Sequence, residues 1–155
     1  MSDLYIELLA DHPNVIPTLA SWEQREWGYL MPGVSLEQFA SACRRRANRD
    51  RIPMTLLGFV DGELVATSSL IVHDMMTRKD LSPWLAIVYV APDHRRKGYG
   101  GAMVRAAMNK TSELGVGELY LFTPDQMAFY ERLGWSMGQL VDYQGKSVTI
   151  MKWIP

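Results

Sequence analysis

The sequence predicts an α/β fold in one domain that spans residues 1–155, and three observations predict it. The chain has 155 residues, the usual size of one domain, and 48 % of them are hydrophobic, enough for one core. Segments of strand-like patterning are interleaved with segments of helical periodicity. No internal repeat or linker interrupts their order, which is strand, two helices, three strands, helix, strand, helix, two strands.

The first third of the chain predicts a strand and two helices. Leu4 to Leu9 is a short, mainly apolar segment that predicts the strand. Asn14 to Tyr29 carries apolar residues at helical spacing, with Pro17 in the first turn, where proline is tolerated. Ser35-Leu36-Glu37-Gln38 has the form of a capping box, so a second helix should begin there and run to about Asn48.

The middle of the chain predicts three consecutive strands. Met54 to Val60 and Leu64 to Val72 flank Asp61-Gly62, a dipeptide typical of a hairpin turn. A polar loop, His73 to Ser82, then leads to a central strand over Pro83 to Ala91.

The last third predicts two further helices and three strands. A helix should cover Gly98 to Leu114, a strand Leu119 to Phe122, and a short helix Asp125 to Leu133. Two final strands, Gln139 to Tyr143 and Ser147 to Trp153, complete the order.

A basic, glycine-rich turn connects the central strand to the helix that follows. Pro92 ends the strand, and Arg95-Arg96-Lys97-Gly98-Tyr99-Gly100-Gly101 leads into the helical segment Ala102 to Met108. Such a turn directs backbone N–H groups at one point, where the helix N-terminus adds a partial positive charge. The turn therefore predicts a cradle for a phosphate group.

Three classes of glycine-rich loop compete for this turn. A Walker A loop needs Lys and then Ser or Thr after its last glycine, but Ala102 and Met103 follow Gly101. A dinucleotide loop needs a third glycine where Met103 stands, and an acidic residue closing the next strand. The third pattern, Arg/Gln-x-x-Gly-x-Gly/Ala, matches Arg95 to Gly100 at each fixed position. The turn thus resembles the pyrophosphate loop of the GNAT superfamily of acyl-CoA-dependent N-acetyltransferases.

A second segment carries the same resemblance. Phe129-Tyr130-Glu131-Arg132-Leu133-Gly134-Trp135 is similar to the family signature Phe-Tyr-x-x-x-Gly-Phe/Trp, and one helix and one strand separate the two signatures, as in the family. The resemblance implies a GNAT fold, with a mixed, mostly antiparallel sheet of about seven strands, splayed central strands and four flanking helices. One departure is Thr123, which stands where many members carry Asn, and its hydroxyl has a shorter reach.

The resemblance also implies a cofactor site for acetyl-CoA. Main-chain amides of the pyrophosphate loop would hold the phosphates, and those of Val88 and Val90 would pair with the pantetheine arm and polarise the acetyl carbonyl. Tyr130 would protonate the departing thiolate. The implied catalytic residues are Tyr130 and Val90. The implied cofactor residues are Val88, Val90, Arg95, Arg96, Lys97, Gly98, Tyr99, Gly100, Gly101, Thr123, Phe129 and Tyr130.

The acceptor side is less clearly marked in the sequence. Glu23, Glu26, His73 and Asp74 are candidates for a general base, with a water chain as the alternative, because the central strand carries no carboxylate. Trp22, Trp27, Tyr29 and Trp84 are candidates for the acceptor wall. The substrate-side prediction comprises Glu23, Glu26, Trp27, His73 and Trp84.

Two further features have competing interpretations. Cys43 lies in the middle of a predicted helix, so we expect a buried, inert thiol and direct transfer in a ternary complex, not an acyl-enzyme. The arginines at positions 44, 45, 46, 49 and 51 predict a solvated helix end, or else a surface for an acidic acceptor or partner.

Composition excludes several classes of function. A net charge of −1 argues against nucleic acid as a partner, and the three histidines lack metal-ligand spacing, so no metal is predicted. No signal peptide or membrane span is visible, and the single cysteine fits a reducing compartment, so we expect a cytoplasmic protein. The prediction is an acetyl-CoA-dependent N-acetyltransferase acting on a primary amine of a small molecule or peptide N-terminus. A non-catalytic acyl-CoA sensor and a homodimer stay open.

Overall fold

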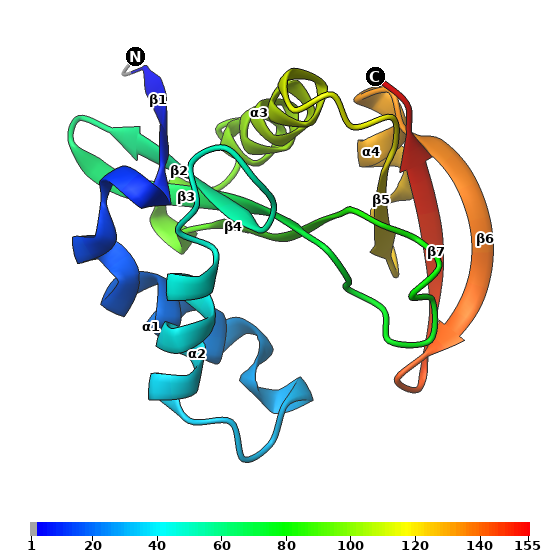
Figure 1. Ribbon diagram of the computed structural model, residues 1–155, viewed down its shortest axis with the longest axis horizontal. Helices are drawn as coiled ribbons and strands as arrows, with labels where there is room; N and C mark the ends of the chain where they lie inside the picture. Colours follow the sequence, from blue (N-terminus) through cyan, green and yellow to red (C-terminus); the bar gives the residue numbers. More distant parts are fainter. Residues whose placement is uncertain (1–2) are drawn as a thin grey trace.

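A seven-stranded sheet with helices on both faces forms the framework of the computed structural model, which describes residues 3–155 (Figure 1). The strands lie in the order β1-β2-β3-β4-β5-β7-β6, and every neighbouring pair is antiparallel except β4 with β5. The strands are β1 (Leu4–Leu8), β2 (Met54–Val60), β3 (Glu63–Ile71), β4 (Trp84–Val90), β5 (Leu119–Thr123), β6 (Ser136–Tyr143) and β7 (Lys146–Trp153). The helices are α1 (Ile16–Trp27), α2 (Leu36–Arg45), α3 (Tyr99–Glu113) and α4 (Met127–Arg132). The predicted order of elements and the mixed, mostly antiparallel sheet are confirmed.

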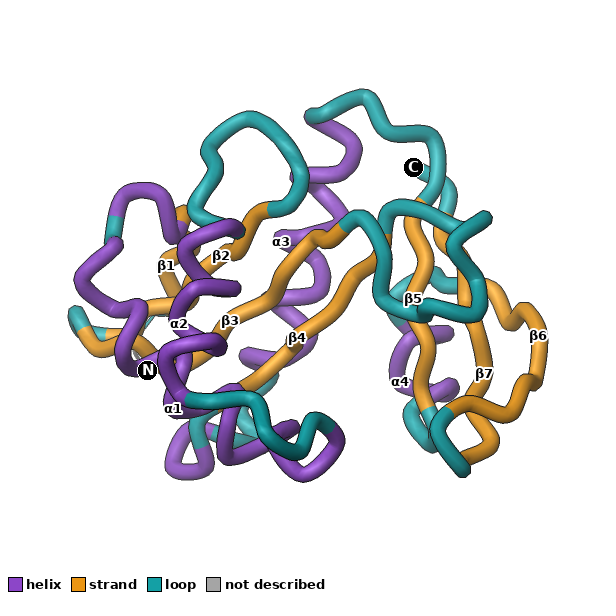
Figure 2. Tube along the Cα trace, turned by 60° about the horizontal axis from the view of Figure 1, so that its bottom comes forward, coloured by secondary structure: helices purple, strands orange, loops and turns teal. Residues whose placement is uncertain are grey.

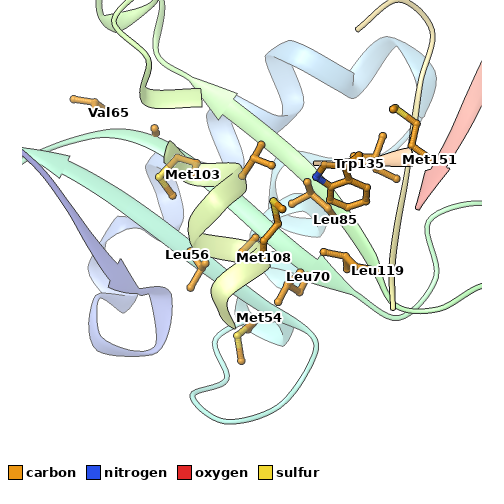
Figure 3. Packing of buried hydrophobic residues seen from close by; sticks show 14 of the residues in the cluster. Met54, Leu56, Val65, Leu70, Leu85, Met103, Met108, Leu119, Trp135 and Met151 are labelled. Atoms are coloured by element: carbon orange, nitrogen blue, oxygen red, sulfur yellow. The ribbon is translucent and has the colours of Figure 1, made fainter. Parts of the chain in front are cut away.

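Helix α3 covers one face of β2, β3 and β4 and contributes most of its apolar residues to the main core (Figure 3). Met103 and Met108 of α3 pack against Leu56, Leu70 and Leu85 of these three strands. All five side chains are buried, and their removal from water is the main term that holds α3 against the sheet.

Helices α1 and α2 cover the opposite face of the same strands, where Leu19 and Phe39 pack on Leu57. The predicted capping box is present at the start of α2. The Gln38 N–H donates to Ser35 Oγ at 3.1 Å, and the Ser35 N–H donates to Gln38 Oε1 at 2.7 Å. Two donors that the helix itself leaves unpaired are thereby satisfied.

A third apolar cluster lies on the C-terminal strands, on the face away from α3. The β3–β4 connection, which the sequence predicts as a polar loop, contributes the fully buried Met75 to this cluster. Met75 packs there with Trp84, Tyr120 and Ile150. The loop is therefore anchored on β5 and β7 by one apolar side chain among polar neighbours.

Asp74 precedes this anchor, and burial raises the pKa of its carboxyl from 3.8 to about 6. A raised pKa in the folded state means that folding favours the protonated carboxyl. Burial of this group therefore does not lower the free energy of unfolding below about pH 4, and it lowers that free energy by its full amount above about pH 6. We expect Asp74→Asn to raise the free energy of unfolding by about 1 kcal/mol at neutral pH and to leave it unchanged at acidic pH. Urea unfolding at both pH values measures this.

Asp80 in the same loop supplies the matched control. Hydrogen bonds from Arg78 lower the pKa of its carboxyl, so Asp80→Asn should lower stability at neutral pH, the opposite sign. Equal stabilities of Asp74→Asn and the wild type at both pH values would show that the Asp74 carboxylate is well solvated.

Candidate active site

The central feature of the site is the place where β4 and β5 part (Figure 2). The two strands share one paired position, Trp84 with Tyr120, where the Tyr120 N–H donates to the Pro83 carbonyl at 3.0 Å. Two residues of β4, Ile87 and Val88, oppose the single Ser68 of β3, which is a β-bulge. A bulge bends its strand, and this one directs β4 away from β5. The predicted splay of the central strands is confirmed.

Ile87 carries the conformational cost of this bulge. Its φ is +55°, which is rare for a β-branched residue because Cβ crowds the backbone. Strained residues of this kind persist only where the surrounding structure fixes them, and they cluster at functional sites. No pattern in the sequence indicates this bulge.

The bulge leaves main-chain groups of β4 facing the splay. The Ala91 N–H donates to the Val65 carbonyl at 2.8 Å, so Ala91 faces β3. Main-chain N–H and carbonyl groups alternate in direction along a strand. Those of Val90, and those of Val88 two residues earlier, therefore point away from β3 and toward the splay. The Val90 carbonyl accepts a hydrogen bond from Arg95 Nε at 2.8 Å. The structure thus places both predicted strand residues at the opening.

The glycine-rich turn forms the N-terminus of α3. Gly98 has φ +84° at the N-cap and no side-chain cap is present there, while the first bond of the helix runs from the Ala102 N–H to the Gly98 carbonyl. The N–H groups of residues 99–101 precede that bond, so they are available to an anion. An added Cβ at Gly98 would meet no atom within 4 Å, so Gly98 is needed for its backbone conformation and not for space.

The basic side chains of the turn divide into two groups. Arg95 folds back onto β4, where it binds the Val90 carbonyl and lies 5.5 Å from the centre of the Tyr89 ring. All three side chains are exposed, but Arg96 and Lys97 have no such contact with β4 among the described hydrogen bonds and ring contacts. Positive side-chain charge beside the cradle therefore comes from Arg96 and Lys97, while Arg95 braces the strand.

Gly100 lies in the first turn of α3, where an added Cβ would make an ordinary 3.7 Å contact with Val90 Cγ2. Valine at this position should therefore leave the fold intact and fill space that a phosphate would use. We expect Gly100→Val to weaken acetyl-CoA binding at least ~10-fold by calorimetry. Gly117→Val is the control, because a Cβ there meets no atom within 4 Å and lies outside the turn. Unchanged affinity in a folded Gly100→Val protein would contradict the cradle.

Tyr130 lies on α4, half-buried among aromatic rings. Its ring centre is 5.0 Å from that of Phe129 and 6.1 Å from that of Trp135. The N–H groups of Leu133 and Trp135 both donate to the Tyr130 carbonyl, which fixes the end of the helix and the position of the ring. Burial raises the pKa of the hydroxyl to about 12, so it stays protonated and can donate a proton.

Thr123 ends β5 at the start of the turn into α4. Its Oγ1 accepts hydrogen bonds from the Gln126 N–H at 3.0 Å and the Asp125 N–H at 3.4 Å, and its side chain is buried. The hydroxyl therefore stabilises the turn that carries Tyr130. The bonding assigns Thr123 a positioning role within the chain.

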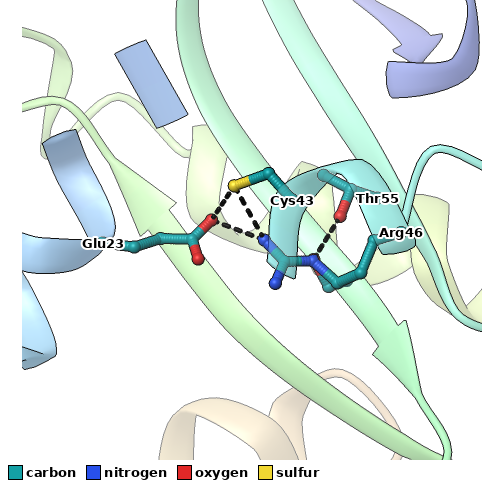
Figure 4. A network of polar contacts seen from close by, with 5 residues as sticks. Glu23, Cys43, Arg46 and Thr55 are labelled. Carbon is teal, nitrogen blue, oxygen red and sulfur yellow. Dashed lines mark hydrogen bonds and ion pairs between the residues drawn. The ribbon is translucent and has the colours of Figure 1, made fainter. Parts of the chain in front are cut away.

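Glu23 is buried in a polar network between α1, α2 and the sheet (Figure 4). Arg46 Nη2 donates to Glu23 Oε2 at 2.6 Å, and Arg46 Nε donates to Thr55 Oγ1 at 2.9 Å. Burial raises the pKa of Glu23, against the lowering effect of Arg46. Two predictions need correction. Glu23 is a structural ion-pair partner, not an accessible base or substrate contact, and Arg46 is not part of a solvated helix end.

Cys43 belongs to the same network and is completely buried, as the sequence predicts. Its thiol donates to Glu23 Oε2 at 3.5 Å, and burial raises the thiol pKa to about 12. The reactive thiolate is therefore suppressed. We expect Cys43→Ala to retain most activity, with initial-rate plots that intersect. An acetyl adduct on Cys43 in intact-protein mass spectra would contradict this.

The remaining acceptor-side candidates separate by exposure. Glu26 on α1 and His73 in the β3–β4 loop are exposed, and Trp27 is half-buried against Tyr89 at a ring distance of 6.2 Å. Trp84 is fully buried and donates its indole N–H to the Leu81 carbonyl, so the prediction that it lines an acceptor wall is wrong. Trp22 also belongs to the core. Tyr89, which the sequence did not single out, is buried and packs against Trp22 and Trp27 of α1.

A model of the acetyltransferase (GNAT) family matches residues 2–135. The chain belongs to the GNAT acetyltransferase family. No curated protein matches this GNAT chain in sequence. Its similarity to solved structures covers almost the whole chain.

One similar GNAT structure is the ribosomal-protein-alanine N-acetyltransferase of Brucella melitensis, with a TM-score of 0.78 and 19 % identity over 97 % of this chain and 99 % of that chain. Another is an aminoglycoside 6'-N-acetyltransferase complexed with coenzyme A, with a TM-score of 0.72 and 16 % identity over 97 % of this chain and 96 % of that chain. A third, a GNAT acetyltransferase of Streptococcus pneumoniae, has a TM-score of 0.71 and 17 % identity over 98 % of this chain and 99 % of that chain. At these identities the similarity establishes the fold.

Residues 3–155 contain no cluster of His, Cys, Asp or Glu that could hold a metal ion. They also contain no helix of the length and apolarity that a membrane crossing requires.

Proposed function

We propose that this GNAT protein transfers the acetyl group of acetyl-CoA directly to a primary amine, within one domain formed by residues 1–155. The observation that carries the proposal is that β4 directs the main-chain N–H groups of Val88 and Val90 into the splay, while the turn after the same strand has the form of an anion cradle. One elongated molecule with a pyrophosphate and a thioester could engage both.

The residues of the cradle fit the phosphate end of that molecule. The N–H groups of residues 99–101 point out of the helix end, and Gly100 leaves the space beside them unfilled. Arg96 and Lys97 add positive charge at the rim. Each phosphate oxygen can accept from these donors, and charge-assisted hydrogen bonds of this kind are the stronger ones.

The reaction then needs two proton movements and one stabilised charge. The amine nitrogen bonds to the thioester carbon while the carbon–sulfur bond breaks. The Val90 N–H donates to the carbonyl oxygen, where negative charge develops. The Tyr130 hydroxyl donates its proton to the departing thiolate, and the amine releases its proton to solvent through water. We assign no side chain as base, because Glu23 is buried in an ion pair.

The test is acetyl-CoA binding by calorimetry followed by CoA release with a panel of amines. The expected result is binding together with amine-dependent thiol release. Binding without release on any amine would indicate a non-catalytic sensor, and absence of binding would refute the proposal. The lone, buried Cys43 suits a reducing compartment, and we propose that the protein works in the cytoplasm.

A further inference from the structure

A pocket of about 440 Å³ lies beside the edge strand β1, on the face of the sheet that α1 and α2 cover. Strand β1 stands at the opposite edge of the sheet from β6 (Figure 1). Side chains from β1, from the segment between β1 and α1, and from the β2–β3 hairpin line the pocket. None of its lining residues belongs to β4, to α4 or to the glycine-rich turn, so the pocket is separate from the candidate active site.

Three aromatic rings border this pocket. Tyr5 of β1 is paired directly with Phe59 of β2, so both side chains lie on the same face of the sheet, with Cβ atoms about 5 Å apart. The centre of the His12 ring is 4.9 Å from that of Phe59. Tyr5 is 63 % exposed, so its ring is available to a ligand. The aromatic border therefore combines residues from three segments of the chain.

Glu7 adds a carboxylate to the same border. It follows Tyr5 by two residues, which puts both side chains on one face of β1. Its Oε2 lies 3.2 Å from His12 Nε2, and this contact holds the imidazole beside Phe59. In the part of the chain that the structure describes, Oε1 of Glu7 has no hydrogen-bond partner. One carboxylate oxygen is thus left for a ligand next to the rings.

The charges around the pocket are mainly negative. Its lining contains no lysine or arginine, and His12 is the lining residue that can become a cation. The other charged residues within two positions of the lining are all acidic, namely Asp3, Asp11, Asp61 and Glu63. Two of these form ion pairs, Asp11 with Arg49 and Glu63 with His94. Even with both partners charged, Asp3 and Glu7 remain as negative charge at this edge of the sheet.

This combination of groups selects the class of ligand. The face of an aromatic ring attracts a cation within about 6 Å of its centre, and a neighbouring carboxylate adds to the attraction. An anion would be repelled by Glu7, and a neutral apolar group would remove water from that carboxylate without replacing its hydrogen bonds. The volume of about 440 Å³ is in the range of small-molecule sites. A compact organic cation therefore fits better than either alternative.

We propose that this pocket binds a compact quaternary ammonium ion, with Tyr5, His12 and Phe59 around the methylated nitrogen and Glu7 beside it. The border offers more ring faces than free carboxylate oxygens, which favours a methylated nitrogen over an ammonium group with its three N–H donors. A quaternary nitrogen has no lone pair and no proton, so such a ligand cannot be the amine that accepts the acetyl group. The site is thus independent of the proposed acetyl transfer.

The test measures choline binding to the wild-type protein without acetyl-CoA, by calorimetry and by amide chemical shifts. The matched ligand is 3,3-dimethylbutan-1-ol, in which a carbon replaces the charged nitrogen and the shape is kept. We expect choline to bind at least about fivefold more tightly than the alcohol. The shifts should concentrate in residues 5–15 and 59–64, which contain the lining.

Two variants separate the ring from the charge. Tyr5→Leu keeps an apolar side chain but removes the ring, and Glu7→Gln keeps the shape but removes the charge. Each should weaken choline binding by about threefold or more, and Glu7→Gln should leave the affinity for the alcohol unchanged. Tyr29→Leu and Glu37→Gln are the controls, since both residues are exposed and lie outside the pocket. Neither control should change choline affinity.

Equal affinities for choline and the alcohol in the wild-type protein, or shifts confined to other parts of the chain, would overturn the cation site. Choline affinities that stay unchanged in both pocket variants would overturn it as well. The wild-type comparison does not depend on the folding of any variant. Because acetyl-CoA is absent throughout, failure of the proposed acetyl transfer leaves these results unaffected.

Discussion

Tyr130→Phe is expected to lower kcat by about 100-fold or more while acetyl-CoA affinity changes little. Phenylalanine keeps the ring, so the contacts with Phe129 and Trp135 survive. Only the proton donor is lost. Its interaction with the leaving sulfur arises as the carbon–sulfur bond breaks, and interactions made only in the transition state change kcat and not ground-state binding.

The measurement is the rate of CoA release by rapid-quench sampling, together with calorimetry on the same variant. Tyr5→Phe, on the far edge strand β1, controls for loss of a hydroxyl elsewhere. A kcat within about threefold of the wild type, with product release shown to be fast, would make Tyr130 a packing residue. The thiolate would then take its proton from water.

Arg46→Met is expected to lower the free energy of unfolding by about 3–5 kcal/mol at neutral pH, because it leaves the buried Glu23 carboxylate without a partner. Arg44→Met is the matched control on the same helix. Arg44 and Glu37 form an exposed pair, whose loss should cost at most about 1 kcal/mol. Urea unfolding of both variants measures the contrast.

Acidification supplies a second test of the same pair. Burial already raises the pKa of Glu23, and removal of Arg46 should raise it further. Protonation of Glu23 then neutralises the unpaired charge, so the loss in Arg46→Met should shrink as pH falls. The double variant Glu23→Leu/Arg46→Met should regain stability for the same reason. A loss that is constant with pH would point to lost packing alone.

The local elements were predictable because their signals are local. The capping box at Ser35 and the glycine-rich turn before α3 each depend on residues close together in sequence. The family signatures then predicted the mixed, mostly antiparallel sheet, while the order of its strands in space comes from the structure. The boundaries shifted by one to three residues, as at α4, which begins at Met127 and not at Asp125.

The features that escaped prediction depend on contacts distant in sequence. Arg46 is indistinguishable in sequence from its exposed neighbours Arg44 and Arg45, and only the approach of α1 brings Glu23 to it. Trp84 and Tyr89 are five residues apart and would point to opposite faces of a regular strand, but the bulge at Ile87 places both on the face away from α3. Tertiary packing and the bulge set these outcomes, so no sequence pattern shows them.

The most direct test of the central claim follows the acetyl group itself. Acetyl-CoA labelled with carbon-13 in the acetyl group is mixed with the wild-type protein and each member of the panel of primary amines, and both protein and amine are followed by mass spectrometry. We expect the label on the amine nitrogen, one CoA released for each acetyl transferred, and none on the protein. Label that appears first on the protein would contradict direct transfer, and label that never reaches any amine of the panel would contradict acetyl transfer altogether.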